Sequence, residues 1–229
     1  MLTEASGRFE LLANADSVAN RAADEILLRA AQAVAGRGRF RILLAGGSTP
    51  LAAYRLLRTR TADWSDWEVY FGDERCLPPD HPERNSLAAR RALLDQVPIP
   101  PENIFAIPAE LGAEQAAHEY AKTIAPALPF DLVLLGMGED GHTASLFPSH
   151  PIPESELVIP VHDAPKPPPD RVSLTPRSLS SCREMLILVT GAGKREALAA
   201  WRGGAELPVA RVAAAGSARV FVDADAAGS

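Results

Sequence analysis

Short runs of apolar residues alternate along the chain with longer segments in which apolar positions recur every three to four residues. The runs include ILLA at residues 42–45, LVLLG at residues 132–136 and MLILVT at residues 185–190. They lack polar alternation, which is typical of strands covered on both faces of a parallel sheet. The pattern predicts strands at residues 40–45, 67–71, 104–107, 131–136, 157–161, 171–175, 184–190 and 218–222.

Segments between these runs have the spacing of amphipathic helices. The first is predicted to begin at the cap residue Ser17 and to end at Gly36. Its inner stripe is expected to be Val18, Ala22, Ile26, Ala30 and Ala33. Pro50 suits the first turn of a second helix at residues 51–57, because the amide proton that proline lacks is not needed there. Further helices are predicted at residues 87–97, capped by Asn85 or Ser86, and at residues 114–128 and 194–201.

Strands and helices in alternation predict an α/β fold with a mostly parallel, doubly wound sheet. We expect a single domain over residues 1–229, since the sequence shows no internal repeat. The proline-rich segment at residues 164–170 is expected to be a stiff surface loop inside that domain. The tail at residues 224–229 is expected to fray.

The charge balance and cysteine content narrow the class of protein. The chain of 229 residues carries 23 Lys and Arg against 29 Asp and Glu, a formal net charge of −6. This argues against a general nucleic-acid binder, which needs a basic face. Residues 1–10 lack the apolar stretch of a secretory signal, and no apolar run has the roughly 18 to 20 residues of a membrane span. Cys76 and Cys182 are too few for a disulfide scaffold, so we expect a cytoplasmic protein.

The loop Ala-Gly-Gly-Ser-Thr-Pro at residues 45–50 follows one predicted strand and opens a helix. Gly46 and Gly47 permit close approach of a ligand to the backbone, and the amides at a helix start bind anions. Ser48 adds a hydroxyl donor. A tight strand-to-helix turn with a Ser or Thr cap fits the same residues, so both interpretations stay open.

A second loop, Phe-Gly-Asp-Glu-Arg-Cys at residues 71–76, places charged residues at the carboxyl end of another strand. Open α/β sheets bind their ligands at that edge. Asp73 and Arg75 are therefore candidate site residues, and the roles of Asp73 and Glu74 stay open, since either one orients Arg75 or only caps the turn. A solvated charged turn is the alternative. Cys76 is interpreted as a half-buried, inert thiol.

The most informative loop is Leu-Leu-Gly-Met-Gly-Glu-Asp-Gly-His-Thr-Ala-Ser-Leu-Phe-Pro at residues 134–148. Its glycines match a dinucleotide-binding fingerprint, but Pro148 excludes the long crossover helix that such a site needs. Asp140 and His142 lie at the mouth of the strand, and histidine can take up and return a proton near neutral pH. A histidine that is hydrogen-bonded into a turn is the alternative.

Two further cations are candidates for holding an anion together with Arg75. Arg171 follows the proline-rich loop, and Lys194 closes the turn Thr-Gly-Ala-Gly-Lys at residues 190–194. Each taken alone also fits a surface charge.

The remaining histidines are interpreted as surface or core residues: His81, His118, His150 and His162. No cluster with the spacing of metal ligands is visible, so no metal or redox cofactor is expected.

Taken together, these motifs resemble the 6-phosphogluconolactonase family. The likeness rests on the loops at residues 45–50, 71–76 and 135–148, on Arg-Val-Ser-Leu-Thr at residues 171–175 and on Gly-Ala-Gly-Lys at residues 191–194. The related glucosamine-6-phosphate deaminases share the Asp-Glu pair and the Gly-x-Gly-x-Asp-Gly-His loop. Their pattern ends in Asn-Glu-Pro where this chain has Leu146-Phe147-Pro148, and Tyr tends to stand where this chain has Arg75. Both departures favour the lactonase.

The resemblance implies a three-layer, Rossmann-like sandwich that hydrolyses 6-phospho-D-glucono-1,5-lactone without a cofactor. By position it implies His142 as general base with Asp140 nearby. It implies that Ser48 and the amides of Gly46 and Gly47, together with the cations, hold the phosphate and the substrate oxygens; those cations are Arg75, Arg171 and Lys194. Arg75 is expected to act in catalysis as well, with its work divided between the phosphate and the reacting carbonyl, and Asp73 is placed among the substrate-binding residues. The partner would be a small phosphosugar, and the protein a monomer or small homo-oligomer. A deaminase or a non-catalytic sugar-phosphate sensor are the alternatives.

Overall fold

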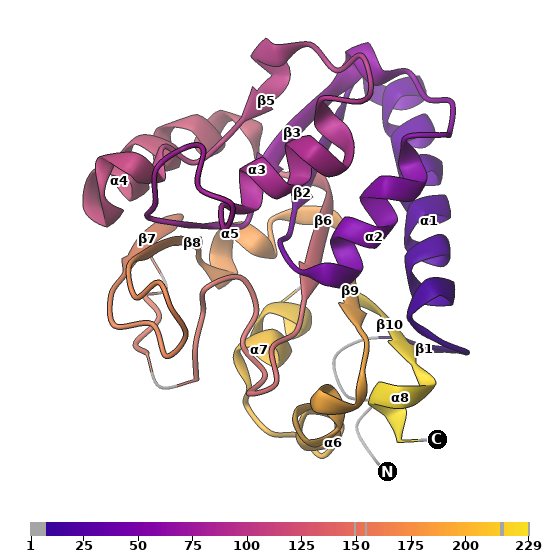
Figure 1. Cartoon of the computed structure of the whole chain (residues 1–229), viewed down its shortest axis with the longest axis vertical. Helices are drawn as coiled ribbons and strands as arrows, with labels where there is room; N and C mark the ends of the chain where they lie inside the picture. Colours follow the sequence, from indigo (N-terminus) through magenta and orange to yellow (C-terminus); the bar gives the residue numbers. More distant parts are fainter. Residues whose placement is uncertain (1–7, 149, 154, 216–217, 229) are drawn as a thin grey trace.

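The computed structural model describes residues 8–148, 150–153, 155–215 and 218–228, and its centre is a large parallel sheet (Figure 1). Seven strands lie in the order β1-β10-β9-β6-β2-β3-β5, and neighbouring strands pair in parallel. The strands are β1 (Arg8–Leu12), β2 (Phe40–Leu44), β3 (Trp67–Phe71), β5 (Ile104–Phe105), β6 (Phe130–Gly136), β9 (Cys182–Val189) and β10 (Ala218–Asp223). The predicted α/β fold with a mostly parallel sheet is confirmed.

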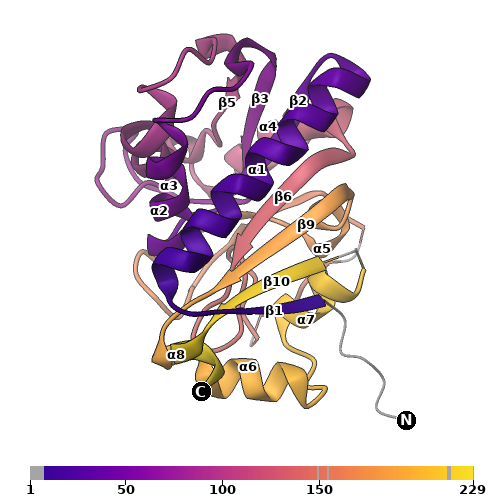
Figure 2. The same ribbon diagram turned by 90° about the vertical axis from the view of Figure 1, so that its right-hand side faces the viewer.

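Helices cover both faces of this sheet, so that the molecule has three layers. Figure 2 shows α1 (Ala15–Arg37) crossing the sheet, with α2 (Ser48–Leu57) and α3 (Asn85–Ala89) on the same side. Figure 1 shows α4 (Ala113–Ile124), α5 (Pro176–Leu179) and α7 (Pro208–Ala214) on the opposite side. Two more helices follow the ends of β9 and β10, namely α6 (Arg195–Arg202) and α8 (Ala224–Ala227). Cover from both sides explains why β6 is buried along nearly its whole length and carries no polar alternation.

Helix α1 buries the predicted stripe from Val18 to Ala33 against the sheet, but both of its predicted ends are wrong. The cap is Asn14, whose side chain accepts a hydrogen bond from the backbone N–H of Ser17 at 2.9 Å. The helix runs through Gly36 and ends at Gly38, which has the left-handed φ of 72° that glycine tolerates best.

A smaller antiparallel sheet, absent from the prediction, consists of β4 (Asp73–Arg75), β8 (Arg171–Leu174) and β7 (Val158–Val161) in that order. The predicted strands at residues 157–161 and 171–175 therefore exist but do not join the large sheet. Gly72 redirects the chain: its N–H donates to Leu44 of β2, and its carbonyl accepts from Leu174 of β8. The loop predicted at residues 71–76 is thus partly a strand.

Three other boundaries differ from the prediction. The backbone N–H groups of Asn85 and Ser86 are held by the Glu74 carboxylate, so neither residue caps α3 with its own side chain. After α3 the chain continues as a turn of π-helix at Arg90–Leu94. Within the tail that is predicted to fray, Ala224–Ala227 form α8, which the Asp223 side chain caps by accepting from the N–H of Ala226 at 2.8 Å. Ser229 lies outside the described residues.

The proline-rich segment at residues 164–170 forms a largely exposed loop, as predicted. It connects β7 to β8, and the side chain of Arg171 in β8 donates a hydrogen bond to the carbonyl of Lys166 in this loop. In the part of the chain that the structure describes, no helix has both the length and the apolar character needed to cross a membrane.

Candidate active site

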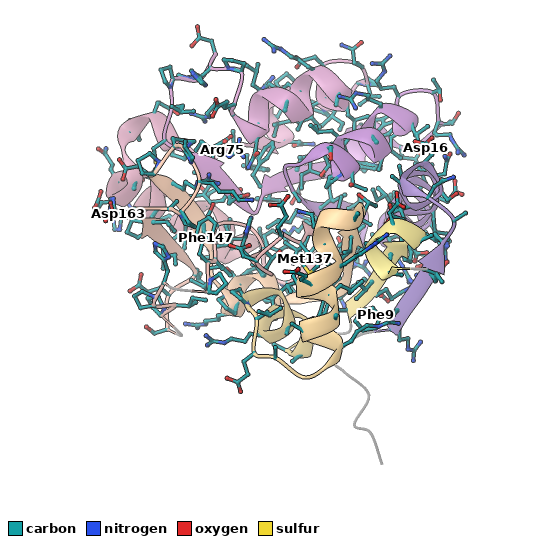
Figure 3. All side chains as sticks on the ribbon, turned by 60° about the horizontal axis from the view of Figure 1, so that its bottom comes forward. Phe9, Asp16, Arg75, Met137, Phe147 and Asp163 are labelled. Carbon is teal, nitrogen blue, oxygen red and sulfur yellow. The ribbon has the colours of Figure 1, made fainter. Side chains whose placement is uncertain are left out.

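The carboxyl ends of β2, β3, β6 and β9 meet at one edge of the large sheet, and a cavity of about 340 Å³ opens there. Such a volume suits a small ligand. The predicted site residues that line the cavity are Gly46, Gly47, Ser48, Asp73, Arg75, His142, Arg171 and Lys194. Figure 3 brings this edge forward and shows the lining residues Arg75, Met137 and Phe147, with Phe9 toward the far margin. Residues from across the sequence are thus brought to one place.

His142 lies at the wall of this cavity with its ring oriented by Asp140. The Nδ1 atom of His142 lies 2.5 Å from Oδ1 of Asp140, and the backbone N–H of His142 donates to the same oxygen at 3.2 Å. The ring also packs on Phe147, with the ring centroids 4.8 Å apart, and the His142 side chain is 18 % exposed. When Nδ1 keeps its proton and donates a hydrogen bond to the Asp140 carboxylate, the neutral ring carries its lone pair on Nε2.

The glycines of the loop at residues 136–142 make room for this ring. A Cβ atom at Gly138 would lie 2.0 Å from Nδ1 of His142, and the N–H of Gly138 donates to the carbonyl of His142 at 2.8 Å. Gly141 has a φ of +80°, which L side chains rarely adopt. The described residues between β6 and β7 contain no helix. The glycines therefore make room for the His142 ring, and the long crossover helix that Pro148 was predicted to exclude is not found among these described residues.

Asp140 itself stays ionised in this arrangement. Partial burial would raise the pKa of the Asp140 carboxyl, but the backbone N–H and the ring of His142 outweigh burial and lower that pKa. A carboxylate that remains charged keeps its hold on Nδ1 and stabilises a protonated ring. Asp140 does not line the cavity, and its carboxylate reaches the site through the ring of His142.

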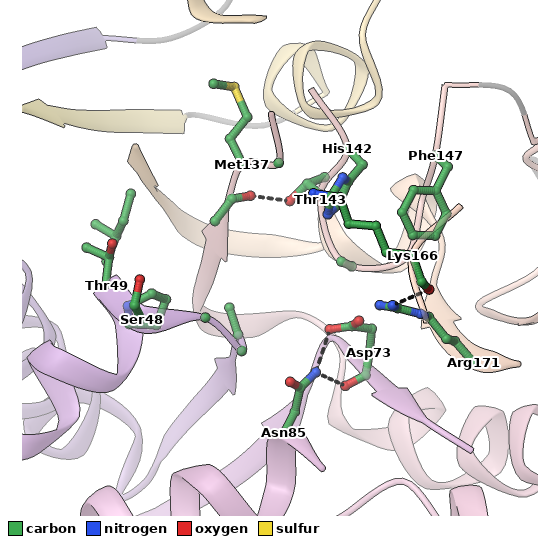
Figure 4. Close-up of a pocket in the computed structure, with 18 of the residues that line it drawn as sticks. Ser48, Thr49, Asp73, Asn85, Met137, His142, Thr143, Phe147, Lys166 and Arg171 are labelled. Carbon is green, nitrogen blue, oxygen red and sulfur yellow. Dashed lines mark hydrogen bonds between the residues drawn. The ribbon is translucent and has the colours of Figure 1, made fainter. Parts of the chain in front are cut away.

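The start of α2 forms the opposite wall of the cavity (Figure 4). Gly47 has a φ of +103°, and α2 begins without a side-chain cap. The absence of a side-chain cap on α2 argues against the Ser or Thr cap that the sequence left open. The residues at the start of α2 line the cavity, so the backbone N–H groups there are placed to bind an anion. Gly46 is needed for a separate reason, since a Cβ atom there would lie 2.1 Å from Oδ1 of Asn85.

Asp73 is a buried residue of the cavity wall, and its carboxylate accepts two hydrogen bonds from distant segments. Its Oδ2 accepts from the Ser145 hydroxyl at 2.7 Å, and its Oδ1 accepts from the Asn85 amide at 3.1 Å (Figure 4). The side chain of Ser145 and the pairing of Asn85 with Asp73 were not predicted. Both depend on contacts between residues far apart in the sequence, for which single motifs carry no signal.

Glu74, whose role the sequence left open, organises the backbone beside the site. It is fully buried, and its carboxylate accepts from the N–H groups of Arg75, Asn85 and Ser86 at 2.7 to 2.9 Å. The buried guanidinium of Arg84 lies 3.3 Å from it. Glu74 therefore caps α3 and fixes the backbone at Arg75, whereas a part in orienting the Arg75 side chain stays a prediction.

Arg75 and Arg171 are direct cross-strand partners in the small sheet, which brings two cations to the same wall. The Arg75 side chain donates to the carbonyl of Glu83. Arg171 donates to the carbonyls of Lys166 at 2.9 Å and Pro168 at 3.1 Å, so it ties the proline-rich loop to the site. Burial lowers the pKa of Arg171 from its ordinary value, although an arginine remains charged at neutral pH.

Lys194 lines the cavity from the turn after β9, and burial lowers its pKa while the charge of Glu139 acts in the opposite direction. A further cation, Lys166, lines the same cavity from the proline-rich loop and was missed. A basic residue between prolines, five positions before a candidate arginine, was the available signal. With Arg75 and Arg171, these lysines give the cavity a basic lining in an acidic protein.

Cys76 follows β4 and is half-buried, as expected. Burial, together with the charge of Asp170, raises the pKa of the Cys76 thiol to about 11. A thiol of that pKa is almost wholly protonated at neutral pH, which fits the interpretation that it is not a nucleophile.

A family model described as glucosamine-6-phosphate isomerases/6-phosphogluconolactonase matches residues 13–222, which is most of the chain. The chain belongs to this family. It is 37 % identical to the 6-phosphogluconolactonase of Mycobacterium leprae, over 93 % of this chain and 92 % of the relative. It is also 37 % identical to the Homo sapiens 6-phosphogluconolactonase, over 86 % of this chain and 82 % of the relative. The predicted family is confirmed, and the names of these relatives support the predicted lactonase.

Solved structures agree with this placement. The structure of 6-phosphogluconolactonase from Thermotoga maritima superposes with a TM-score of 0.88 at 28 % identity, over 95 % of this chain and 99 % of that one. A monomeric glucosamine-6-phosphate deaminase superposes with a TM-score of 0.84 at 18 % identity, over 96 % of this chain and 99 % of that one. The second likeness shows the shared fold alone, and it confirms the expected three-layer architecture.

Proposed function

We propose that this protein hydrolyses 6-phospho-D-glucono-1,5-lactone to 6-phospho-D-gluconate, with His142 as the general base. The observation that carries the proposal is the position of the His142 ring, oriented by Asp140, in a cavity whose lining is basic. A ring directed into the apolar interior, or distant from every cation, would have argued against catalysis. Membership of a family that includes the lactonases supports the choice of substrate.

In this proposal Nε2 of His142 removes a proton from water as the water oxygen attacks the lactone carbonyl carbon. The bond between that carbon and the ring oxygen then breaks, and the imidazolium returns its proton to the leaving ring oxygen. One residue suffices because the proton leaves and comes back at the same nitrogen. General-base catalysis of this kind contributes about 10² to 10⁴-fold. A donor at the developing oxyanion adds roughly 2.7 to 4 kcal/mol.

Substrate binding is assigned to the basic lining and to the start of α2. Arg75, Arg171 and Lys194 would hold the phosphate and substrate oxygens, together with Ser48 and the amides of Gly46 and Gly47. Hydrogen bonds to charged groups contribute about 1.5 to 3 kcal/mol each, and a helix start about 0.3 to 1 kcal/mol. Anchoring the phosphate fixes the sugar, so that the ester carbon stays beside His142. Asp73 supports this wall through Asn85.

The residue at position 147 separates this activity from the deamination of an amino sugar. In the deaminase pattern a glutamate occupies this position, whereas Phe147 is fully buried here and packs against the His142 ring. Enolisation needs a carboxylate that can move a proton, and a phenyl ring cannot do so. Water activation by a histidine needs only the oriented ring.

The acidic charge argues against a nucleic-acid partner, and the size of the cavity suits a small phosphosugar. We extend the proposal to a cytoplasmic enzyme without a membrane partner, on the low cysteine content of the chain. We extend the proposal to a monomer or small homo-oligomer. The decisive experiment is an assay of freshly made 6-phosphogluconolactone at controlled pH, with the spontaneous decay subtracted. We expect enzyme-dependent hydrolysis and no release of ammonia from glucosamine 6-phosphate. Decay at the spontaneous rate, or ammonia release, would overturn the proposal.

A further inference from the structure

An acidic residue lies beside two lysines that line the basic cavity. Glu139 lies in the loop after β6, between Gly138 and Asp140, and its side chain is 62 % exposed. Its Oε2 lies 3.4 Å from Nζ of Lys166 on the proline-rich loop. Its Oε1 comes within 3.2 Å of where a Cβ atom would stand at Gly193, the residue before Lys194. The carboxylate of Glu139 therefore contacts Lys166 while it lies against the turn that carries Lys194.

The two lysines that Glu139 approaches belong to the cavity lining. Figure 4 shows Lys166 extending from the proline-rich loop toward the loop that carries His142. The charges of Glu139 and Lys166 both act on Lys194, in opposite directions. A carboxylate oxygen and a phosphate oxygen make the same kind of contact with an ammonium group. Glu139 thus occupies a contact that an incoming phosphate would otherwise make.

We propose that Glu139 is an affinity-determining residue that competes with the substrate phosphate for Lys166 and repels it from the cavity. The inference rests on the proposed function, because it takes the phosphate of the substrate as the displacing group. The carboxylate weakens the binding of phosphorylated ligands and leaves the chemistry at His142 unchanged. Because Glu139 and Lys166 are both at least half exposed, their ion pair is weak and the phosphate can displace it.

The test is Glu139→Gln, which keeps the shape of the side chain and removes its charge. We expect the KM for 6-phosphogluconolactone, and the inhibition constants of inorganic phosphate and 6-phosphogluconate, to fall about two- to fivefold. The kcat should not change. The gain should shrink in about 0.5 M KCl, where salt screens exposed charges. An unchanged or higher KM for Glu139→Gln in an active enzyme would overturn the proposal.

Two matched variants separate a local effect from a change in net charge. Glu102→Gln makes the same charge change just before β5, at the amino-terminal edge of the sheet, and should leave every constant unaltered. In a Lys166→Met background the effect of Glu139→Gln should be smaller, because the competed contact is gone. An equal effect in both backgrounds would remove Lys166 from the proposal and so refute it.

Binding of inorganic phosphate, measured by calorimetry, distinguishes this inference from the proposed function. Tighter phosphate binding by Glu139→Gln supports the role of Glu139 even if the wild-type protein fails to hydrolyse the lactone. A wild-type protein that hydrolyses the lactone but binds phosphate as tightly as Glu139→Gln contradicts the role of Glu139 and leaves the proposed function standing.

Discussion

The Nδ1 atom of His142 lies 2.5 Å from Oδ1 of Asp140, and a glycine, Gly138, lies directly behind this pair. The carboxylate fixes which nitrogen carries the proton, and the glycine leaves space for the ring. A ring held in this way needs no reorientation before the proposed proton transfer at Nε2. The consequences of this relationship are open to direct measurement.

Replacing His142 by Asn removes the proposed base and keeps a polar side chain. We expect kcat for 6-phosphogluconolactone to fall about 10² to 10⁴-fold, with KM changed little, because the phosphate contacts remain. Steady-state kinetics corrected for spontaneous decay provide the measurement. His118→Asn is the control, since His118 is an exposed residue of α4 and its replacement should not alter kcat. Near-normal turnover of His142→Asn would exclude His142 as the base.

Gly138→Ala tests the space behind the ring. The added Cβ would lie 2.0 Å from Nδ1 of His142, so the ring must move away from Asp140. A displacement of about 1 Å costs up to roughly 10²-fold in rate, and we expect kcat to fall by tenfold or more.

The control for this substitution is Gly36→Ala in α1, where a Cβ atom would meet nothing within 4 Å. Alanine there should raise the free energy of unfolding by about 0.5 to 1 kcal/mol and leave kcat unchanged. Urea unfolding and the lactone assay measure the two effects. Full activity of Gly138→Ala would show that the ring tolerates displacement, contrary to the mechanism.

The elements that the sequence predicts well are those set by local patterns. The strand predicted at residues 131–136 is present as β6 at Phe130–Gly136. Its prediction succeeded because an unbroken run of apolar residues indicates a strand that is buried on both faces of the sheet. The inner stripe of α1 was correct for the same kind of reason, since helical spacing determines which positions face the sheet. The candidate residues met at one cavity because the carboxyl ends of parallel strands share an edge.

The features that were missed depend on contacts between distant segments. Nothing in either segment indicates that Asp73–Arg75 pairs with Arg171–Leu174 to form a second sheet. The cap of α3 comes from Glu74, eleven positions before Asn85, so the usual search for a cap beside the helix start failed. Lys166 lines the cavity from a loop whose carbonyl groups accept hydrogen bonds from Arg171, a residue of another segment. Patterns of single segments carry no information on such long-range pairing.

Lys194→Met tests the assignment of phosphate binding. The variant removes one charged donor from the cavity lining and keeps a side chain of similar length. We expect KM for the phosphorylated lactone to rise about 10- to 100-fold, in keeping with roughly 1.5 to 3 kcal/mol for a hydrogen bond to a charged group. The comparison substrate is D-glucono-1,5-lactone, which lacks the phosphate, and its KM should change little. A rise of the same size for both lactones would show that Lys194 does not contact phosphate.

His162 predicts a pH dependence of stability that is separate from catalysis. Its Nδ1 lies 2.7 Å from Asp170 and its Nε2 lies 2.7 Å from Glu114 of α4, so it links the end of the proline-rich loop to that helix. These hydrogen bonds, with Asp170 first and Glu114 second, raise the pKa of His162 above its ordinary value. A raised folded-state pKa stabilises the fold fully below the unfolded-state value of about 6.5, and this stabilisation is lost as the pH rises through the folded-state pKa.

The variant His162→Gln should therefore lower the midpoint of urea unfolding more at about pH 5.5 than at about pH 9, because only the protonated ring attracts both carboxylates. The difference should be small, since the His162 side chain is 46 % exposed and solvent screens the pairs. His118→Gln, on the same helix as Glu114, is the matched control and should show no such dependence on pH. Equal destabilisation by His162→Gln at both values would mean that the ring acts through uncharged packing, and the two ion pairs would then contribute nothing to the fold.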